Sequence, residues 1–478
     1  MNLRNRIKRL TGRLSPEEAL DEPATPVRET VKEALQPLAL YVPSLKDFEY
    51  KDLIHDKLLQ ILDLSLLTNA APEVARASIR ENALRLIDQL ALPVSAAGRQ
   101  QLVKLIEDEV LGLSILEPLL NEPSVSDILV NGAHSIFVER HGRLELTPLR
   151  FKDDDHVMKI IDRIVSSVGR RIDESSPMVD ARLKDGSRVN AIIPPLAIDG
   201  PTLSIRRFIA DRMGLEDLVA RGSMSADMVE VLKAVIKGRI NVLISGGTGT
   251  GKTTLLNALS NFIPPAERVI TIEDAAELQL QQPHVIRLET RPPNIEGRGQ
   301  VTQRDLVRNS LRMRPDRIIL GEARGGEAFD MLQAMNTGHD GSLTTVHANA
   351  PRDAISRFEN MISMAGFEIP AKAVRQQIAS AIDVIIQLER MEDGQRRVVS
   401  INEVEGMEGD VVTMSEIFTF DRRGIDDEGN VLGRFVSTGV VPRFCERLRK
   451  RGTPLSTDYF MPDAGDTTGE YRTWINKP

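Results

Sequence analysis

Ten residues near the middle of the chain, SGGTGTGKTT at 245–254, constrain its fold more than any other stretch. The spacing Gly246-x-x-x-x-Gly251-Lys252-Thr253 allows the backbone to curl with its N–H groups pointing inward, and such a cavity suits phosphate. The preceding run INVLISG is typical of a buried parallel strand, and the following LLNALSNFI has the apolar face of a helix. The stretch therefore predicts a strand, a phosphate-binding loop and a helix.

The side chains of this loop have separate expected roles. We expect Lys252 to reach the β and γ oxygens of a nucleotide and Thr253 to place its hydroxyl on Mg²⁺. The helix that begins there directs the positive end of its dipole at the same charges. The residues expected to bind the nucleotide are Gly246, Gly247, Thr248, Gly249, Thr250, Gly251, Lys252, Thr253 and Thr254.

Carboxylates follow two of the predicted strands. TIEDAAEL (271–278) ends one strand with Glu273 and Asp274 and adds Glu277 in the next turn, and RIILGEARGGEA ends another with Glu322. Hydrolysis needs a held metal and an oriented water, which acidic strand ends can supply. One acidic strand end is common in α/β proteins, but two that follow one phosphate loop in the same sheet form a stronger signal. These carboxylates are therefore candidates for the catalytic site.

Two of the seven histidines, His339 and His347, flank a single predicted strand in TGHDGSLTTVHANA. A lone histidine is more often structural, but two beside one strand in the domain of the phosphate loop favour a role as sensors. We interpret His347 as the residue that detects the γ-phosphate. No third ligand has the spacing of a zinc site, so we do not expect these histidines to bind metal.

Arginines matter because phosphoryl transfer needs positive charge opposite the loop. Arg206 and Arg207 end a predicted strand, LSIRRF, just before a linker. Two readings stay open: the pair is solvated or salt-bridged, or it acts on a nucleotide held between two domains of one subunit or of neighbouring subunits. Arg314 and Arg317 in RMRPDRIIL are further candidates.

Composition limits the other classes of function. Aromatic residues make up only 4% of the 478 residues and the net charge is −8, which argues against a nucleic-acid-binding platform. The single cysteine, Cys445, excludes a disulfide framework within the chain and a Cys₄ zinc site. No apolar run approaches the ~18 residues of a membrane span, and the N-terminus lacks the apolar core of a signal peptide. We expect a cytosolic protein.

The pattern along the chain predicts an α/β protein, in which a P-loop nucleotide domain with a mostly parallel sheet follows a helical extension and a small α+β domain. The basic start MNLRNRIKRLTGR is either a disordered tail, which we favour, or a short helix on an anionic membrane. The predicted segments are a basic N-terminus and flexible linker (1–45), a helical subdomain (46–118), an α+β domain (119–212), the nucleotide domain (213–390), a strand-rich C-terminal subdomain (391–462) and a tail (463–478).

Together, these motifs resemble a known family. The phosphate loop, TIEDAAEL, RMRPDRIILGEARGGEA and TGHDGSLTTVHANAPRDAISRF look like the Walker A, Asp box, atypical Walker B and His box of the ATPases of type II and type IV secretion systems. GRRIDESSPMVDARLKDGSRVNAIIPP, LSIRRF and INEVEGMEGDVVTMSEIFTF resemble the CpaF/TadA-type ATPases of tight-adherence (Flp) pilus assembly. The resemblance covers roughly residues 50 to 460 and combines several motifs, which makes it specific.

The resemblance implies a RecA-like fold and a hexameric motor that uses ATP and Mg²⁺ at the cytoplasmic face of the inner membrane. It implies action on inner-membrane pilus platform proteins, without direct contact to nucleic acid. The sequence departs from the family in lacking a proline after the aspartate of EDAAE and in lacking the tetracysteine zinc module of many extension ATPases. A type IV secretion traffic ATPase and, as a more distant alternative, a nucleic-acid-dependent motor remain open.

The family motifs also carry residue roles onto this sequence. Apart from these motifs, we also expect Glu273 and Arg207 to lie beside the bound nucleotide. The catalytic and metal-binding roles that the resemblance implies are Lys252 and Thr253 for Walker A, Glu277 as the glutamate that polarises water, Glu322 as the acid near Mg²⁺, His339 and His347 as the His box, and Arg206 as a nucleotide-contacting arginine.

Overall fold

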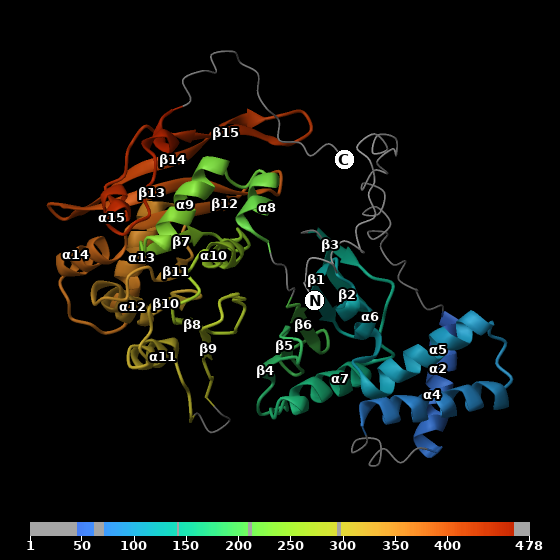
Figure 1. Ribbon diagram of the computed structural model, residues 1–478. Coiled ribbons are helices and arrows are strands. Elements are labelled where there is room, and N and C mark those ends of the chain that lie inside the picture. The colour runs from blue at the N-terminus through green and yellow to red at the C-terminus, as the bar shows by residue number, and fades with distance from the viewer. Residues whose placement is uncertain (1–44, 62–70, 141–142, 209–212, 294–297, 463–478) are drawn as a thin grey trace, which may run out of the picture. The chain divides into compact units, whose positions relative to one another are not determined.

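The computed structural model describes residues 45–61, 71–140, 143–208, 213–293 and 298–462 (Figure 1). The predictions for the basic N-terminus, most of its linker and the C-terminal tail lie outside these residues. The chain divides into two compact units, one formed by residues 1–122 with 148–150 and one by 123–147 with 151–478. The division into six segments stays a prediction.

The first unit is helical, as the apolar periodicity predicts. Its buried aliphatic residues include Ile54, Ile79 and Ile106, one from each of three helices. The pattern of GRQQLVKLIEDEVLGLSILEPLL predicts a helical segment, but the helix is interrupted at Gly112, which is in an extended conformation. The elements of this unit are α2 (Leu45–Ile61), α4 (Pro72–Gln89), α5 (Ala96–Leu111), η2 (Ser114–Leu116) and α6 (Glu117–Asn121).

The second unit begins with a six-stranded antiparallel sheet in the order β3-β2-β1-β6-β5-β4. Its strands alternate buried and exposed residues, which is why one face packs and the other contacts solvent. The elements are β1 (Val125–Asn131), β2 (Ser135–Arg140), β3 (Arg143–Leu146), α7 (Asp154–Ser167), β4 (Met178–Arg182), β5 (Arg188–Ile192) and β6 (Thr202–Arg206).

A nine-stranded sheet forms the rest of this unit, in the order β15-β14-β13-β12-β7-β11-β10-β8-β9. The six strands from β12 to β9 in that order are parallel, and the last three strands of the chain are antiparallel. The strands are β7 (Val242–Gly246), β8 (Val269–Glu273), β9 (Val285–Glu289), β10 (Arg317–Leu320), β11 (Leu343–Val346), β12 (Val384–Arg390), β13 (Arg396–Glu408), β14 (Val411–Ile425) and β15 (Val431–Ser437).

Helices cover both faces of the large sheet (Figure 1). The helices over one face are α8 (Leu215–Ala220), α9 (Ala226–Lys237), α10 (Lys252–Ser260), α15 (Phe444–Lys450) and η3 (Thr457–Phe460). Those over the other are α11 (Gln303–Ser310), α12 (Glu327–Asn336), α13 (Pro351–Met364) and α14 (Ala371–Ala381). This arrangement confirms the predicted α/β class with a mostly parallel sheet.

Two details differ from the sequence expectation. The apolar pattern of HVIRLET predicts a buried strand, but β9 lies at the sheet edge and is only partly buried, because no strand among the described residues pairs with its outer side. The strand-rich C-terminal segment continues the central sheet, since β13 pairs with β12 and β14 with β13. None of the helices in the described part of the chain combines the length and apolarity that a membrane crossing needs.

Candidate functional site

The loop between β7 and α10 is shaped by its glycines. Gly249 and Gly251 have φ of 72° and 96°, a region that side chains with a Cβ rarely adopt. A Cβ on Gly246 would lie 2.6 Å from the Thr250 hydroxyl and 2.7 Å from the carbonyl oxygen of Leu388. The Thr250 hydroxyl in turn donates to the Gly247 carbonyl at 2.9 Å. The loop therefore has the closely folded backbone that a phosphate cradle requires.

Lys252 is the buried cation of this loop. Its side chain is held by two carbonyl groups, since Nζ donates to Gly246 O at 3.0 Å and to Gly247 O at 2.7 Å. Burial lowers the pKa of Lys252, and Glu322 partly offsets that effect. None of the ion pairs of the described residues involves Lys252, so its charge is available to an anion at the start of α10. The residues of this loop therefore fit a nucleotide phosphate.

The carboxyl ends of β7, β11, β10 and β8 form one edge of the sheet. In the parallel register Val346 lies beside Ser245, and Leu320 lies beside both Thr344 and Ile272. Residues that directly follow these strands consequently gather at the edge that carries the phosphate loop.

Glu322 and His347 meet at this edge. His347 Nε2 lies 3.0 Å from one carboxylate oxygen of Glu322, and the Arg324 guanidinium donates to the other at 2.7 Å. Burial favours the neutral form of Glu322, but the hydrogen bond and charge of Arg324, with His347 and Lys252, outweigh it and lower the pKa. Burial lowers the pKa of His347, which favours a neutral imidazole. The structure thus joins three predicted site residues: Lys252, Glu322 and His347.

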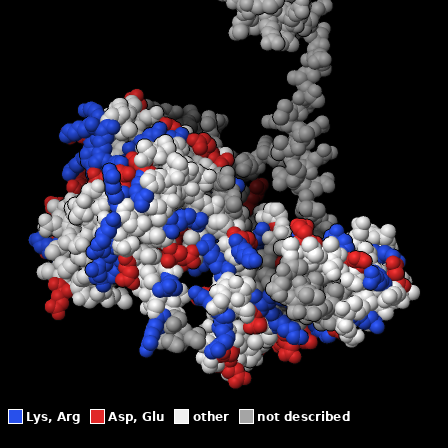
Figure 2. All heavy atoms as spheres, turned by 60° about the horizontal axis from the view of Figure 1, so that its bottom comes forward, with Lys and Arg blue, Asp and Glu red and all other residues white. Residues whose placement is uncertain are grey.

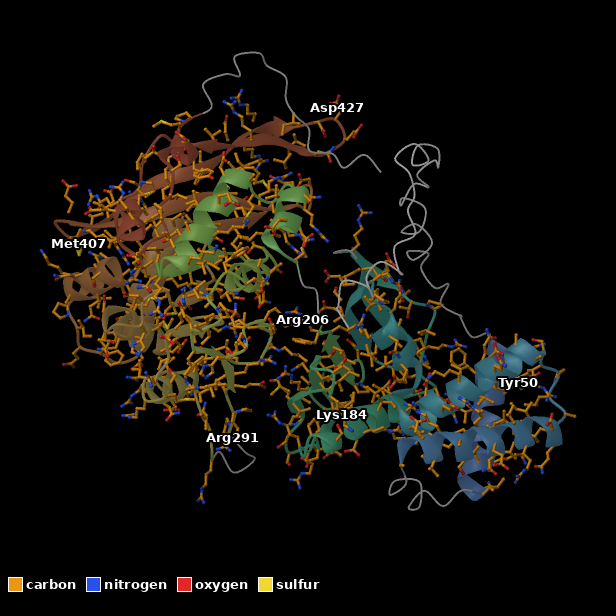
Figure 3. All side chains as sticks on the ribbon, in the orientation of Figure 1. Tyr50, Lys184, Arg206, Arg291, Met407 and Asp427 are labelled. Carbon is orange, nitrogen blue, oxygen red and sulfur yellow. The ribbon has the colours of Figure 1, made fainter. Side chains whose placement is uncertain are left out.

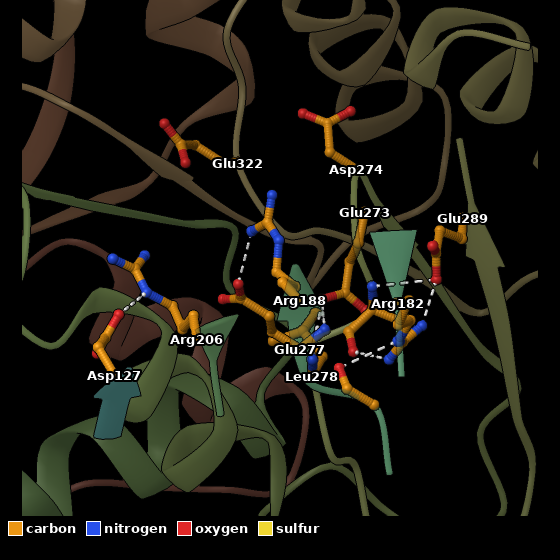
Figure 4. A network of polar contacts seen from close by, with 12 residues as sticks. Asp127, Arg182, Arg188, Arg206, Glu273, Asp274, Glu277, Leu278, Glu289 and Glu322 are labelled. Atoms are coloured by element: carbon orange, nitrogen blue, oxygen red, sulfur yellow. Dashed lines mark hydrogen bonds and ion pairs between the residues drawn. The ribbon is translucent and has the colours of Figure 1, made fainter. Parts of the chain in front are cut away.

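Glu273 and Glu277, which are close in sequence, have different surroundings. Glu273 is 4% exposed, and its Oε2 accepts from the backbone N–H of Glu277 at 2.7 Å and of Leu278 at 2.8 Å. Its Oε1 has no hydrogen-bond partner among the described residues, and burial raises its pKa to about 7. The Glu277 side chain is 37% exposed and accepts from Arg188 at 2.8 Å (Figure 4). Glu273 therefore holds the turn, and Glu277 is the carboxylate that a substrate water can reach.

The structure adds two arginines that the sequence analysis missed. Arg188 on β5 contacts Glu277, and Arg182 on β4 donates to Ala276 O at 2.7 Å and pairs with Glu289 at 2.5 Å (Figure 4). Both lie in DARLKDGSR, a segment that carried part of the family resemblance, where two basic residues flank a Gly turn. That pattern was the available signal, but arginines beside a turn are common on protein surfaces.

Arg206 and Arg207 are bound to the small sheet. Arg206 lies at the end of β6 (Figure 3). It pairs with Asp127 at 3.0 Å (Figure 4). The hydrogen bond to Asp127 is the main cause of the raised pKa of Arg206. Its side chain is 67% exposed. Arg207 donates to Val125 O at 2.8 Å. The salt-bridged reading therefore describes Arg206 in this chain, and a role on nucleotide stays a prediction.

A cavity of about 970 Å³ adjoins this network. Arg182, Arg188 and Arg206 line it from the small sheet, and Asp274 and Arg324 line it from the ends of β8 and β10. Neither the phosphate loop nor Glu277 is part of its lining. Lys and Arg occur in groups with Asp and Glu between them on the face shown in Figure 2, as is usual for a solvated surface.

His339, Arg314 and Arg317 lie away from the loop. His339 precedes the amino end of β11, at the opposite edge of the sheet, where its Nδ1 is 3.3 Å from Ala334 O. Arg317 is fully buried at the amino end of β10 and pairs with Glu267. Arg314 is exposed. In this chain the geometry supports structural roles for His339 and Arg317. It does not support a role at the phosphate loop for His339, Arg314 or Arg317.

Comparison with known proteins agrees with this site. The sequence pattern of the type II/IV secretion system protein family matches residues 109–425. The chain belongs to this family. Its structure has the α/β fold of the family. The matched region includes the phosphate loop, Glu277, Glu322, His339 and His347.

Among relatives, a Mycobacterium tuberculosis protein whose name assigns it to conjugal transfer is 37% identical over 68% of this chain and 93% of its own. The type IV secretion system protein VirB11 of Bartonella quintana is 32% identical over 63% of this chain and 96% of its own. Of solved structures, the VirB11 ATPase of the Brucella suis type IV secretion system is 29% identical over 60% of this chain and 92% of its own, with a TM-score of 0.33.

Proposed function

We propose that this chain is an ATPase that powers transport through a type IV secretion system. The observation that carries the proposal is the cluster of Lys252, Glu322 and His347 at the phosphate-loop edge of the sheet. The names of the relatives, conjugal transfer proteins and VirB11, favour secretion over the pilus function that we expected from sequence motifs. The working form that we propose is a homo-hexamer, peripheral to the cytoplasmic face of the inner membrane and associated with membrane components of the system.

The chain's own residues provide the parts of phosphoryl transfer. Lys252 exchanges its contacts with loop carbonyls for contacts with phosphate oxygens, and Thr253 and Glu322 are the oxygen ligands that would hold Mg²⁺. Bound Mg²⁺ supplies positive charge that stabilises the phosphate oxygens. His347, which contacts the Glu322 carboxylate, is the residue that we propose responds to the γ-phosphate. Glu277 orients the attacking water.

The Arg188–Glu277 ion pair links hydrolysis to movement. Arg188 belongs to the small sheet, whereas Glu277 belongs to the turn that follows β8 of the large sheet. Arg188 holds one carboxylate oxygen of Glu277, so a rearrangement of this contact changes how Glu277 orients a water. ATP then favours the arrangement of the two sheets in which Glu277 is free, and ADP favours another, which is how binding energy becomes work.

Phosphate release by the purified full-length chain with ATP and MgCl₂ tests the activity. Lys252→Ala should lower turnover at least ~100-fold, because the cation on the β and γ oxygens is lost. Glu277→Gln should retain ATP binding but hydrolyse slowly. The exposed Lys237→Ala is the matched control and should behave as wild type. Wild-type turnover by Glu277→Gln would remove Glu277 from the water-orienting role.

Assembly of a tight-adherence pilus is the second candidate. It is favoured by the segments GRRIDESSPMVDARLKDGSRVNAIIPP and INEVEGMEGDVVTMSEIFTF, which resemble the CpaF/TadA-type ATPases. A chromosomal Lys252→Ala replacement in the native host separates the two functions, provided the variant accumulates normally. Lost conjugal transfer or secretion with intact surface filaments supports the secretion proposal, whereas lost thin pili in electron micrographs supports the pilus. Strong ATPase stimulation by single-stranded DNA would contradict both and indicate a nucleic-acid motor.

A further inference from the structure

Two arginines from the β12–β13 hairpin lie against the phosphate loop. Strand β12 runs parallel to β7 with Leu388 beside Gly246, so the end of β12 reaches the start of the loop. Arg390 is the last residue of β12 and Arg396 is the first of β13, and the two are direct cross-strand partners. The hairpin thereby places two positive charges beside the loop.

Arg396 is bound to the loop backbone. Its Nε donates to the carbonyl oxygen of Gly249 at 2.9 Å. Its Cδ would also lie 3.5 Å from a Cβ on Gly251, which is an ordinary van der Waals distance. The N–H groups of such a loop turn toward phosphate. Arg396 donates to the Gly249 carbonyl, which turns outward, and therefore fixes the loop without competing with its N–H groups for the phosphate.

Arg390 has no such bond. Its Nη1 would lie 4.0 Å from a Cβ on Gly249. The Arg390 guanidinium forms no hydrogen bond or ion pair with any other described residue. Like charges that face each other across a strand pair are unfavourable. Burial, and next to it the nearby charge of Arg390, lower the pKa of Arg396, which is the direction that repulsion between the two arginines predicts.

The charges around Arg396 leave the hairpin short of negative partners. Arg221 at the end of α8 adds a third positive charge, and Glu139 of β2 is the acidic group that acts on Arg396. The two acids in the turn of the hairpin, Glu392 and Asp393, pair with Arg422 and Arg397 instead. A bound anion would therefore relieve unfavourable charge at this place.

We propose that Arg390 and Arg396 are additional nucleotide-affinity residues: Arg396 positions the phosphate loop through Gly249, and Arg390 stabilises the charge of the bound polyphosphate. This inference rests on the proposed ATPase function and deepens it. It assigns the segment that follows the parallel strands a role in binding nucleotide. Arg396 acts through the loop, Arg390 acts on the phosphate charge, and neither contacts the water-orienting Glu277. The two residues therefore affect affinity and not the chemical step.

Calorimetric binding of ADP with MgCl₂ and steady-state ATP hydrolysis by the full-length chain test the proposal. Arg390→Met and Arg396→Met should each weaken ADP binding and raise KM for ATP about three- to tenfold, with kcat within about twofold. Arg390→Lys should restore the affinity because it keeps the charge. The penalty of Arg390→Met should shrink between low and high salt, since a screened charge contributes less.

Arg434→Met is the matched control, an exposed arginine on β15 that lies 3.9 Å from Asp421 and should bind ADP as wild type does. The proposal is overturned if the Arg390 and Arg396 variants bind ADP like Arg434→Met, or if Arg390→Lys is as weak as Arg390→Met. A fall in kcat with unchanged KM also overturns it. If the wild-type chain neither binds ADP nor hydrolyses ATP, the proposed function fails as well, so the two failures are distinguishable.

Discussion

Replacing Glu273 with glutamine should change how the stability of the protein depends on pH. The carboxyl is 4% exposed, one of its oxygens has no partner among the described residues, and its pKa rises from 4.5 to about 7. Between these values the folded chain keeps a proton that the unfolded chain has released. The free energy of unfolding therefore falls as the pH rises through this window. Below the window and above it, Glu273 adds no further dependence on pH.

The magnitude follows from the size of the shift. Each pKa unit corresponds to about 1.36 kcal/mol, so wild type should lose up to ~3 kcal/mol between about pH 4.5 and pH 7 through this group. Glutamine has nearly the same shape, keeps an oxygen that accepts backbone N–H groups, and cannot ionise. Glu273→Gln should thus gain stability over wild type as the pH rises.

Thermal melting at pH 5 and pH 8 measures this difference. A change of ~3 kcal/mol corresponds to a relative shift in Tm of several degrees for a domain of this size. Glu368→Gln, which replaces an exposed glutamate, is the control and should follow wild type at both pH values. An equal difference in Tm between wild type and Glu273→Gln at pH 5 and pH 8 would refute the reasoning, because the carboxyl would then not titrate in this window.

Three further predictions concern packing and buried charge. Gly246→Ala should abolish ADP binding measured by calorimetry, because its Cβ would lie 2.6 Å from a threonine hydroxyl; Gly247→Ala, whose Cβ meets nothing closer than 3.7 Å, should bind nearly as wild type. Arg317→Met should lower the free energy of unfolding by about 3 kcal/mol, since it removes the cation that pairs with the buried Glu267 carboxylate. An unchanged Tm would contradict this. In the helical unit, Lys51→Met should lower the free energy of unfolding by a similar amount. The exposed Lys104→Met should lower it by less than about 1 kcal/mol. Urea unfolding followed by circular dichroism measures both changes.

The parts of the site that could be predicted lie within short stretches of sequence. The glycine spacing at 246–251 determines the loop, because a Cβ would clash at Gly246 and because Gly249 and Gly251 have positive φ. Each parallel strand has four to seven residues, mostly apolar, and the residue after it lies at the carboxyl edge of the sheet. Lys252, Glu322 and His347 could therefore be placed near one another before any tertiary contact was known.

The sequence by itself thus determined the fold class, the phosphate loop and the acidic strand ends, because these depend on local spacing and periodicity. Tertiary structure alone decided the contacts across long separations: Arg188 meets Glu277 across 89 residues and Arg396 meets Gly249 across 147. It also separated His339 from His347, since the two ends of β11 lie at opposite edges of the sheet. Such contacts depend on strand order and on which sheets meet, and neither leaves a local pattern in the chain.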